Sequence, residues 1–158
     1  MSTRLLLLLA IAALPACSKK ASDVPLEEVR DDAFGYSIKM PEGATQTEKG
    51  SGRQVWSWSP DNHVNSYSCI LQHETLDAFT ADAAKKDVAM IRDPKTITST
   101  QALGSDGLVV ELAEDATTHY RETWCFKKGK TATMVAICTG PAAGKTVTAM
   151  ATSLQVTN

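Results

Sequence analysis

Hydrophobic and polar residues alternate along the first half of the chain in a pattern that predicts three β-strands. The predicted strands cover residues 33–40, 54–59 and 65–73. Proline-containing turns follow the first two of them, at residues 41–43 and 60–62, as expected where a strand ends. Because side chains alternate between the two faces of a strand, Trp56 and Trp58 are expected to lie on one face.

The hydrophobic period then lengthens to that of an α-helix. Residues 76–92 carry one apolar stripe, formed by Leu76, Phe79, Ala83, Ala84, Val88 and Ile91. Thr75 or Asp77 is suited to cap the start of this helix, and Asp93-Pro94 ends it. A second stripe near the end of the chain predicts a helix over residues 142–154, through Val147, Met150, Ala151 and Leu154.

Four further strands are predicted between the two helices, at residues 96–103, 108–113, 120–127 and 131–138. Lys128-Gly129-Lys130 separates the last two and predicts a hairpin, which we expect to have a two-residue loop. Short connections favour antiparallel neighbours, and two amphipathic helices need a sheet to cover. The order of elements therefore predicts an α+β sandwich with an antiparallel sheet.

The chain opens with a segment that looks like an export signal. Arg4 precedes an apolar run over residues 5–13, which is shorter than the ~20 residues that a membrane-spanning helix needs. Leu14-Pro15-Ala16-Cys17 follows and resembles the lipobox of bacterial lipoproteins, although small residues are commoner than proline at its second position. The resemblance implies cleavage after residue 16 and lipidation of Cys17. An ordinary signal peptide with a chance cysteine is the alternative.

The residues after Cys17 bear on where such a protein would reside. Residues 17–32 are interpreted as the lipidated N-terminus and a polar tether, which leaves residues 33–158 as a single domain. In Gram-negative lipoproteins an Asp after the lipidated cysteine favours the inner membrane. Ser18 therefore implies an outer-membrane protein that faces the periplasm, held to the membrane by its lipid.

Composition excludes one class of partner. The whole chain has 16 basic and 18 acidic residues, and removal of a signal containing Arg4 makes the net charge about −3. A nucleic-acid-binding surface needs clustered positive charge, so we expect no nucleic-acid partner.

Three cysteines would remain in the mature chain, namely Cys69, Cys125 and Cys138. An exported protein meets an oxidising compartment, so one disulfide and one buried thiol are expected. The residues alone leave the pairing open. The predicted two-residue loop, however, would place Cys125 opposite Met134, too far from Cys138 for a bridge.

The domain resembles the Mog1/PsbP-like fold group over residues 33–154. The residues that carry this resemblance are the GYSIKMPEG strand, the central helix, the CFKKGKTATMVAICTGP hairpin and the terminal helix ending in ATSL. The resemblance implies a six- to seven-stranded antiparallel sheet with helices on both faces, and a non-enzymatic accessory role. It also implies that the third and seventh predicted strands are neighbours, which favours a Cys69–Cys138 disulfide and leaves Cys125 free.

Few residues point to specific chemistry, and we expect no metal or cofactor. Trp56 and Trp58 could form an aromatic binding surface or could belong to the core. The three histidines lack metal-binding spacing, and the loop at residues 140–146 has one residue too few between its glycines for a phosphate-binding P-loop.

The acidic residues near the predicted tether are expected to be solvated; they are Glu27, Glu28, Asp31 and Asp32. The sequence thus favours a non-enzymatic envelope lipoprotein that binds an unknown envelope protein. The alternatives are an envelope enzyme with several titratable groups in a deep pocket, and a small-ligand carrier with an apolar cavity between sheet and helix.

Overall fold

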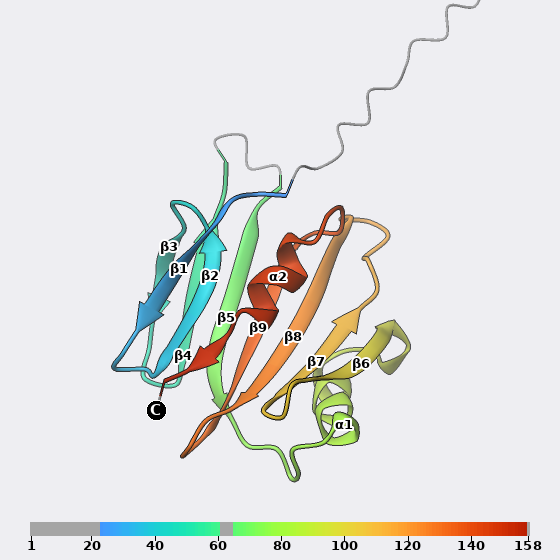
Figure 1. Cartoon of the computed structure of the whole chain (residues 1–158). Helices are drawn as coiled ribbons and strands as arrows, with labels where there is room; N and C mark the ends of the chain where they lie inside the picture. The colour runs from blue at the N-terminus through green and yellow to red at the C-terminus, as the bar shows by residue number, and fades with distance from the viewer. Residues whose placement is uncertain (1–22, 61–64, 158) are drawn as a thin grey trace, which may run out of the picture.

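The computed structural model describes residues 23–60 and 65–157, which form two antiparallel sheets (Figure 1). The larger sheet has the strand order β3 (Thr45–Lys49), β4 (Arg53–Trp58), β5 (Tyr67–Glu74), β9 (Thr133–Pro141), β8 (Tyr120–Lys128), β7 (Gly107–Leu112) and β6 (Ile97–Leu103). The smaller sheet has the order β1 (Leu26–Asp31), β2 (Tyr36–Pro41) and β10 (Gln155–Val156). All neighbouring strands are antiparallel, which confirms the predicted fold class.

Two α-helices cover opposite faces of the larger sheet, as the resemblance implied (Figure 1). Helix α1 (Ala81–Ile91) buries Ala84 and Val88 against one face. Helix α2 (Thr146–Thr152) buries Met150 on the other face, where it shares a hydrophobic core with the smaller sheet. Within the described residues, no helix has the length and apolar character that crossing a membrane would require.

Both helices are shorter than the sequence predicts. Helix α1 begins after Thr80, whose hydroxyl accepts a hydrogen bond from the Ala83 N–H, so neither Thr75 nor Asp77 is the cap. Leu76 and Phe79 contribute to the predicted stripe because they pack against the same core from the preceding loop. Helix α2 begins at Thr146, since Gly144 has a φ of +86°, which does not belong to a right-handed helix.

Three strands lie outside the sequence-based prediction. The prediction that residues 17–32 form a tether is wrong for its later part, because Leu26–Asp31 form β1 and pair with β2. Strand β3 supplies the seventh strand of the larger sheet, whereas the first predicted strand corresponds to β2 in the smaller sheet. Strand β10 adds two residues to the other side of β2.

The β8–β9 hairpin has a longer loop than predicted. Lys128 pairs with Thr133, and residues 129–132 connect the strands, with the Gly129 N–H donating to the Ala132 carbonyl at 2.8 Å. A two-residue loop usually needs residues that accept positive φ, and only Gly129 is of that kind here. The register therefore places Cys125 opposite Ala136 instead of Met134.

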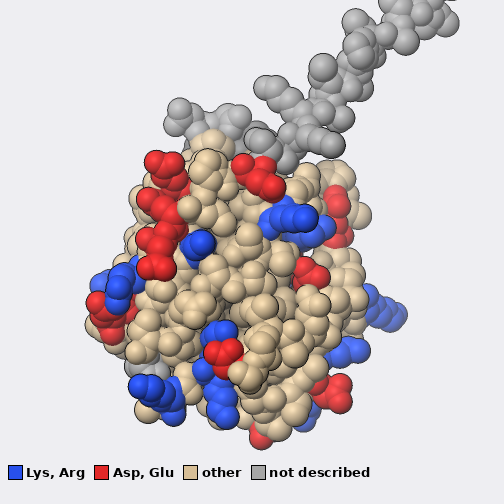
Figure 2. Space-filling model, in the orientation of Figure 1, with Lys and Arg blue, Asp and Glu red and all other residues tan. Residues whose placement is uncertain are grey.

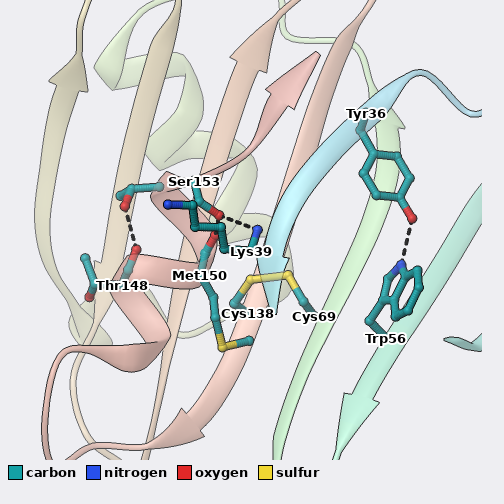
Figure 3. The surroundings of a disulfide bond; sticks show 9 residues. Tyr36, Lys39, Trp56, Cys69, Cys138, Thr148, Met150 and Ser153 are labelled. Atoms are coloured by element: carbon teal, nitrogen blue, oxygen red, sulfur yellow. Dashed lines mark hydrogen bonds between the residues drawn. A yellow bond between two sulfur atoms is a disulfide. The ribbon is translucent and has the colours of Figure 1, made fainter. Parts of the chain in front are cut away.

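The disulfide joins Cys69 of β5 to Cys138 of β9, as the resemblance implied (Figure 3). The two residues are direct partners in the β5–β9 register, and their Cα atoms lie 4.1 Å apart. Cys138 faces Thr123 on its other side, so Cys125 remains a free, buried thiol. The disulfide thus links the middle of the larger sheet beneath α2.

The first described residues join the domain beside the start of α2. The Lys145 N–H donates to Asp23 Oδ1 at 2.9 Å, and the Glu42 N–H donates to the Pro25 carbonyl at 3.1 Å. We call this part of the molecule the junction end, and the opposite part, at the loop over residues 129–132, the hairpin end. Cys17 and the predicted signal lie outside the described residues.

Candidate binding site

Trp56 and Trp58 share a face of β4, and both are half-buried against the core beneath the smaller sheet. The Trp56 Nε1–H donates to the Tyr36 hydroxyl at 2.7 Å (Figure 3). The Trp58 ring lies 5.8 Å from that of Tyr67, centroid to centroid. Both tryptophans therefore belong largely to the packing between the sheets, which leaves only part of each ring for a ligand.

A buried polar network continues from Trp56 to Asp31. The Tyr36 hydroxyl donates to Gln54 Oε1 at 2.6 Å, and Gln54 Nε2 donates to Asp31 Oδ2 at 3.0 Å. Lys49 Nζ lies 3.1 Å from the same carboxylate oxygen. The prediction that Asp31 is solvated is wrong, because this carboxylate connects the smaller sheet to β3 and β4.

Hydrogen bonds stabilise the ionised form of Asp31. Its Oδ1 accepts from the Phe34 and Ala33 N–H groups, both at 3.0 Å. Together with the donors Gln54 and Lys49, the Phe34 N–H lowers the pKa of Asp31 to about 2. This network has a structural role, since each polar group in it already has a partner.

A groove of about 330 Å³ opens beyond the C-terminal end of α1. Its lining includes the apolar side chains of Leu112 and Ala113, the ring of Tyr120 and the hydroxyl-bearing Thr139. Tyr120 and Thr139 stand where β8 begins and β9 ends, so the groove lies at the junction end. The groove thus combines apolar and polar surface close to the point where the preceding chain joins the domain.

An ion pair borders this groove. Arg92 Nε and Nη2 donate to the two oxygens of Glu122 at 2.9 and 3.0 Å, and the Trp124 Nε1–H donates to Glu122 Oε1 at 2.6 Å. The hydrogen bond to Glu122 raises the pKa of Arg92 above its ordinary value. Two-point contact with a guanidinium holds both side chains in a defined geometry.

The other carboxylates of the groove are also engaged. Asp93 accepts from the Lys95 N–H at 2.9 Å, and Glu114 lies 2.7 Å from His119 Nδ1. Asp115 accepts from the Thr118 N–H at 2.7 Å and from the Thr118 hydroxyl at 3.0 Å, and these bonds lower the pKa of Asp115. The carboxylates of the groove therefore all have hydrogen-bond or ion-pair partners within the protein.

Sequence reasoning missed the Arg92–Glu122 pair. The two residues are 30 positions apart, and the predicted helix and strand contain no pattern that brings them together. One signal was present, because Glu122 occupies the same strand face as Tyr120, Trp124 and Phe126. A carboxylate among aromatic residues on one face indicates a partner supplied by another element.

The remaining candidates are dispersed. His73 packs against Phe34 at a centroid distance of 4.7 Å, and His63 lies outside the described residues. Among the described residues, no group of three or more His, Cys, Asp or Glu side chains is placed to hold a metal ion. In the loop before α2, the Lys145 N–H donates to Asp23, so this hydrogen bond helps to hold the first described residues against the domain.

Two more cavities lie toward the hairpin end. One of about 390 Å³ runs between the β5–α1 segment and the β8–β9 loop, and one of about 230 Å³ lies beside α1. Both open on the surface. Between α2 and the sheet, where a small-ligand carrier would need an apolar cavity, Met134, Met150 and Leu154 are fully buried and fill the layer.

Surface charge is mixed over the face that carries α2. Acidic and basic side chains are interspersed there without a continuous basic area (Figure 2). Among the described residues, several charged side chains form pairs within 4.0 Å, including Arg30–Asp32 and Arg53–Glu48. On this face the mixed distribution of charge agrees with the near-balanced composition of the chain.

The fold defines the class of this domain as a PsbP-like α+β sandwich. Among solved structures, the chain is similar to the solution structure of cyanobacterial PsbP (CyanoP) from Synechocystis sp. PCC 6803, with a TM-score of 0.55 and 13% sequence identity. The similarity covers 90% of this chain and 98% of that chain. No protein-family profile matches the sequence, and no curated protein matches it. At this identity the likeness concerns the fold.

Proposed function

We propose that the mature protein is a lipoprotein of the bacterial cell envelope with a non-enzymatic, partner-binding role. Its lipid is carried by Cys17, within Leu14-Pro15-Ala16-Cys17, and Ser18 favours the outer membrane, facing the periplasm. The partner is an envelope protein that binds in the groove beyond α1.

The short segment between the proposed lipid and the domain limits how far the groove lies from the membrane. Five residues separate Cys17 from Asp23, and a fully extended chain spans at most about 3.5 Å per residue. The junction end therefore stays within roughly 20 Å of the lipid. Because the groove lies at the same end, its partner is itself a membrane protein or a protein close to the membrane surface.

The proposal of a binding role rests on the carboxylates of the groove, which are already hydrogen-bonded to neighbouring groups. General acid–base catalysis requires a group that is free to exchange a proton with a substrate. Glu122 is instead engaged at both oxygens by Arg92, and Asp115 accepts hydrogen bonds from Thr118. An apolar floor bordered by preorganised polar groups is typical of a protein-binding surface.

Replacement of Cys17 by Ser tests the anchor. The variant should move from the membrane fraction to the soluble envelope fraction, because the lipid attachment atom is missing. Cys125→Ala is the matched control and should stay in the membrane fraction. Separation of the two membranes on a density gradient then tests the outer-membrane location. Retention of Cys17→Ser with the membranes at unchanged mass would contradict the proposal.

Site-specific photo-crosslinking tests the groove. A photoreactive residue at the exposed position Ala113 should capture one envelope protein in intact cells. The same group at Asp82, exposed on the first turn of α1, is the control and should not capture that protein. Arg92→Ala should reduce the yield from position 113, since it frees Glu122 from its two-point contact. Equal capture at both positions would argue against the groove.

A further inference from the structure

Four of the described strands lie at the edges of the two sheets, and three of them are protected against pairing with another chain. Strand β1 carries four charged residues among its six, and β10 has only two residues. Strand β3 contains Glu48 and Lys49 and a bulge between Gln46 and Glu48. Charge, bulges and short length are the usual means by which proteins block strand addition.

Strand β6 lacks most of this protection. It has seven residues, Ile97-Thr-Ser-Thr-Gln-Ala-Leu103, with neither a charged residue nor a proline. A bulge between Ile97 and Ser99 affects only its start, and Ser99 to Leu103 pair regularly with β7. In the larger sheet β6 is the terminal strand, with β7 as its single neighbour (Figure 1).

The register shows which main-chain groups of β6 point outward. In an antiparallel ladder, alternate residues direct both their N–H and C=O toward the same neighbour. The Ala113 N–H donates to the Thr96 carbonyl at 2.7 Å, so Ala113, and by alternation Glu111 and Val109, face β6. The β6 residues opposite them direct their main-chain groups toward β7. The alternate residues of β6, Thr100 and Ala102, therefore direct their N–H and C=O groups away from the sheet.

We propose that the outer edge of β6 receives an extended segment of a partner protein as an eighth strand of the larger sheet. Thr100 and Ala102 supply the main-chain donors and acceptors, and β6 pairs with no described strand other than β7. Strand addition of this kind derives its affinity mainly from main-chain hydrogen bonds.

The absence of charged residues in β6 indicates which kind of partner segment would pair with it. With no charge on β6, an acidic or basic segment gains no cross-strand ion pair, whereas β-branched residues pack well beside Thr100 and Ala102. The occupant is therefore an uncharged stretch rich in Thr, Val or Ile, and not a charged linear motif.

A second copy of this chain is the other occupant that fits an uncharged edge, so dimerisation is an outcome of the test below. Two copies joined antiparallel through β6 would have their junction ends at opposite ends of the joined sheet, about 30 Å apart. Five residues lie between Cys17 and Asp23, and this segment reaches roughly 20 Å. With the strands perpendicular to the membrane, only one junction end would lie within reach of it, which disfavours the dimer; this step rests on the proposed lipid anchor.

Binding of a synthetic strand to the detergent-solubilised full-length protein tests the proposal. The probe is a fluorescent peptide of seven alternating Thr and Val residues followed by two lysines, measured by fluorescence anisotropy. Two further versions carry N-methyl groups on alternate residues along one edge, or on all residues of the strand. The unmodified and one-edge versions should bind the wild-type protein, and full methylation should weaken binding at least tenfold. Equal binding of all three peptides would overturn the proposal.

A variant pair places the interaction at β6. Ala102→Pro removes an outward N–H and keeps the β7 ladder, so it should weaken binding of the unmodified peptide about tenfold with an unchanged unfolding midpoint. Ala102→Ser keeps the N–H and should bind like the wild type. Unchanged binding by a folded Ala102→Pro protein would overturn the proposal, as would wild-type dimerisation that this variant abolishes. If Ala102→Pro does not fold, the binding of the methylated peptides to the wild-type protein tests the proposal. None of these results depends on the fractionation of Cys17→Ser.

Discussion

At the scale of single residues, Asp31 combines burial with a full set of donors. Its carboxylate is 8% exposed, and it accepts from two main-chain N–H groups and from Gln54 while lying beside Lys49. A charged acceptor in such a position stabilises the folded state because the unfolded chain cannot reproduce the arrangement. Through these contacts Asp31 connects the end of β1 to the larger sheet.

Asp31→Asn should lower the free energy of unfolding at pH 7 by about 1–3 kcal/mol, since the hydrogen bonds to a charged group become neutral ones. The control is Asp32→Asn, whose 74% exposed carboxylate pairs with Arg30 and should contribute less than about 1 kcal/mol. Urea denaturation monitored by circular dichroism measures both. Equal effects of the two substitutions would contradict this assignment.

The same carboxylate predicts a pH dependence. Folding lowers the pKa of Asp31 from 3.8 to about 2. The stabilisation that comes from this shift is therefore present above pH 4 and is lost as the pH falls toward 2. Wild-type stability should decrease more steeply than that of Asp31→Asn over this interval, and parallel pH profiles would show that the carboxylate is not the cause.

Cys125 illustrates how burial controls the reactivity of a residue. Burial raises the pKa of its thiol from 9.0 to about 12, because the interior disfavours the thiolate. At pH 8 iodoacetamide should leave Cys125 unmodified in the folded protein and alkylate it fully after denaturation without reductant. Peptide mapping should find Cys69 linked to Cys138 in both samples. Rapid alkylation of the native protein would show that the thiol is accessible.

At the scale of elements, the docking of the C-terminal segment depends on few side chains. Leu154 follows α2 and is completely buried in the core that α2 shares with the smaller sheet. Leu154→Ala should reduce the free energy of unfolding by about 2–5 kcal/mol, because it creates a cavity. Met90→Ala, at a position that is 72% exposed on α1, should have little effect. An unchanged melting temperature for Leu154→Ala would exclude a tightly docked segment.

Elements with a buried, alternating face were predictable from the sequence, and exposed elements were not. Strands β5 and β9 were located because apolar residues mark their inner positions, and the resemblance supplied their adjacency. Strand β1 has the sequence LEEVRD and only one buried residue, and β3 has none, so neither shows a hydrophobic period of two. These short strands are held by long-range pairing, which local sequence does not encode.

The candidate site was less predictable than the fold. The two tryptophans were correctly placed on one face, but their commitment to packing depends on β2, whose position over β4 is a tertiary feature. Likewise, the groove requires α1, β8 and the loop over residues 113–119 to converge. Such a surface is defined by three distant segments, none of which has a chemical motif of its own.

At the scale of the whole molecule, the disulfide links two central strands across a sequence separation of 69 residues. A cross-link over this separation restricts the unfolded chain, and the chain-entropy relation gives a stabilisation of about 4 kcal/mol. The double variant Cys69→Ala/Cys138→Ala should lose stability of that order in urea titrations. Reduced wild-type protein should lose a similar amount, while Cys125→Ala should respond to reductant as the wild type does. Insensitivity to reductant would show that the bridge contributes little.

The position of β1 also has a mechanical consequence. The chain reaches the domain at the start of β1, so tension on residue 17 is directed along this strand, and its hydrogen bonds to β2 run perpendicular to the strands. Six residue pairs therefore share the load in shear and do not open one after another. With handles at positions 17 and 130, force spectroscopy should show β1 detaching at a lower force in Asp31→Asn than in the wild type, and equal forces would rule out this role. In the proposed lipid-anchored protein, force would therefore act first on β1, a strand that the sequence alone does not predict.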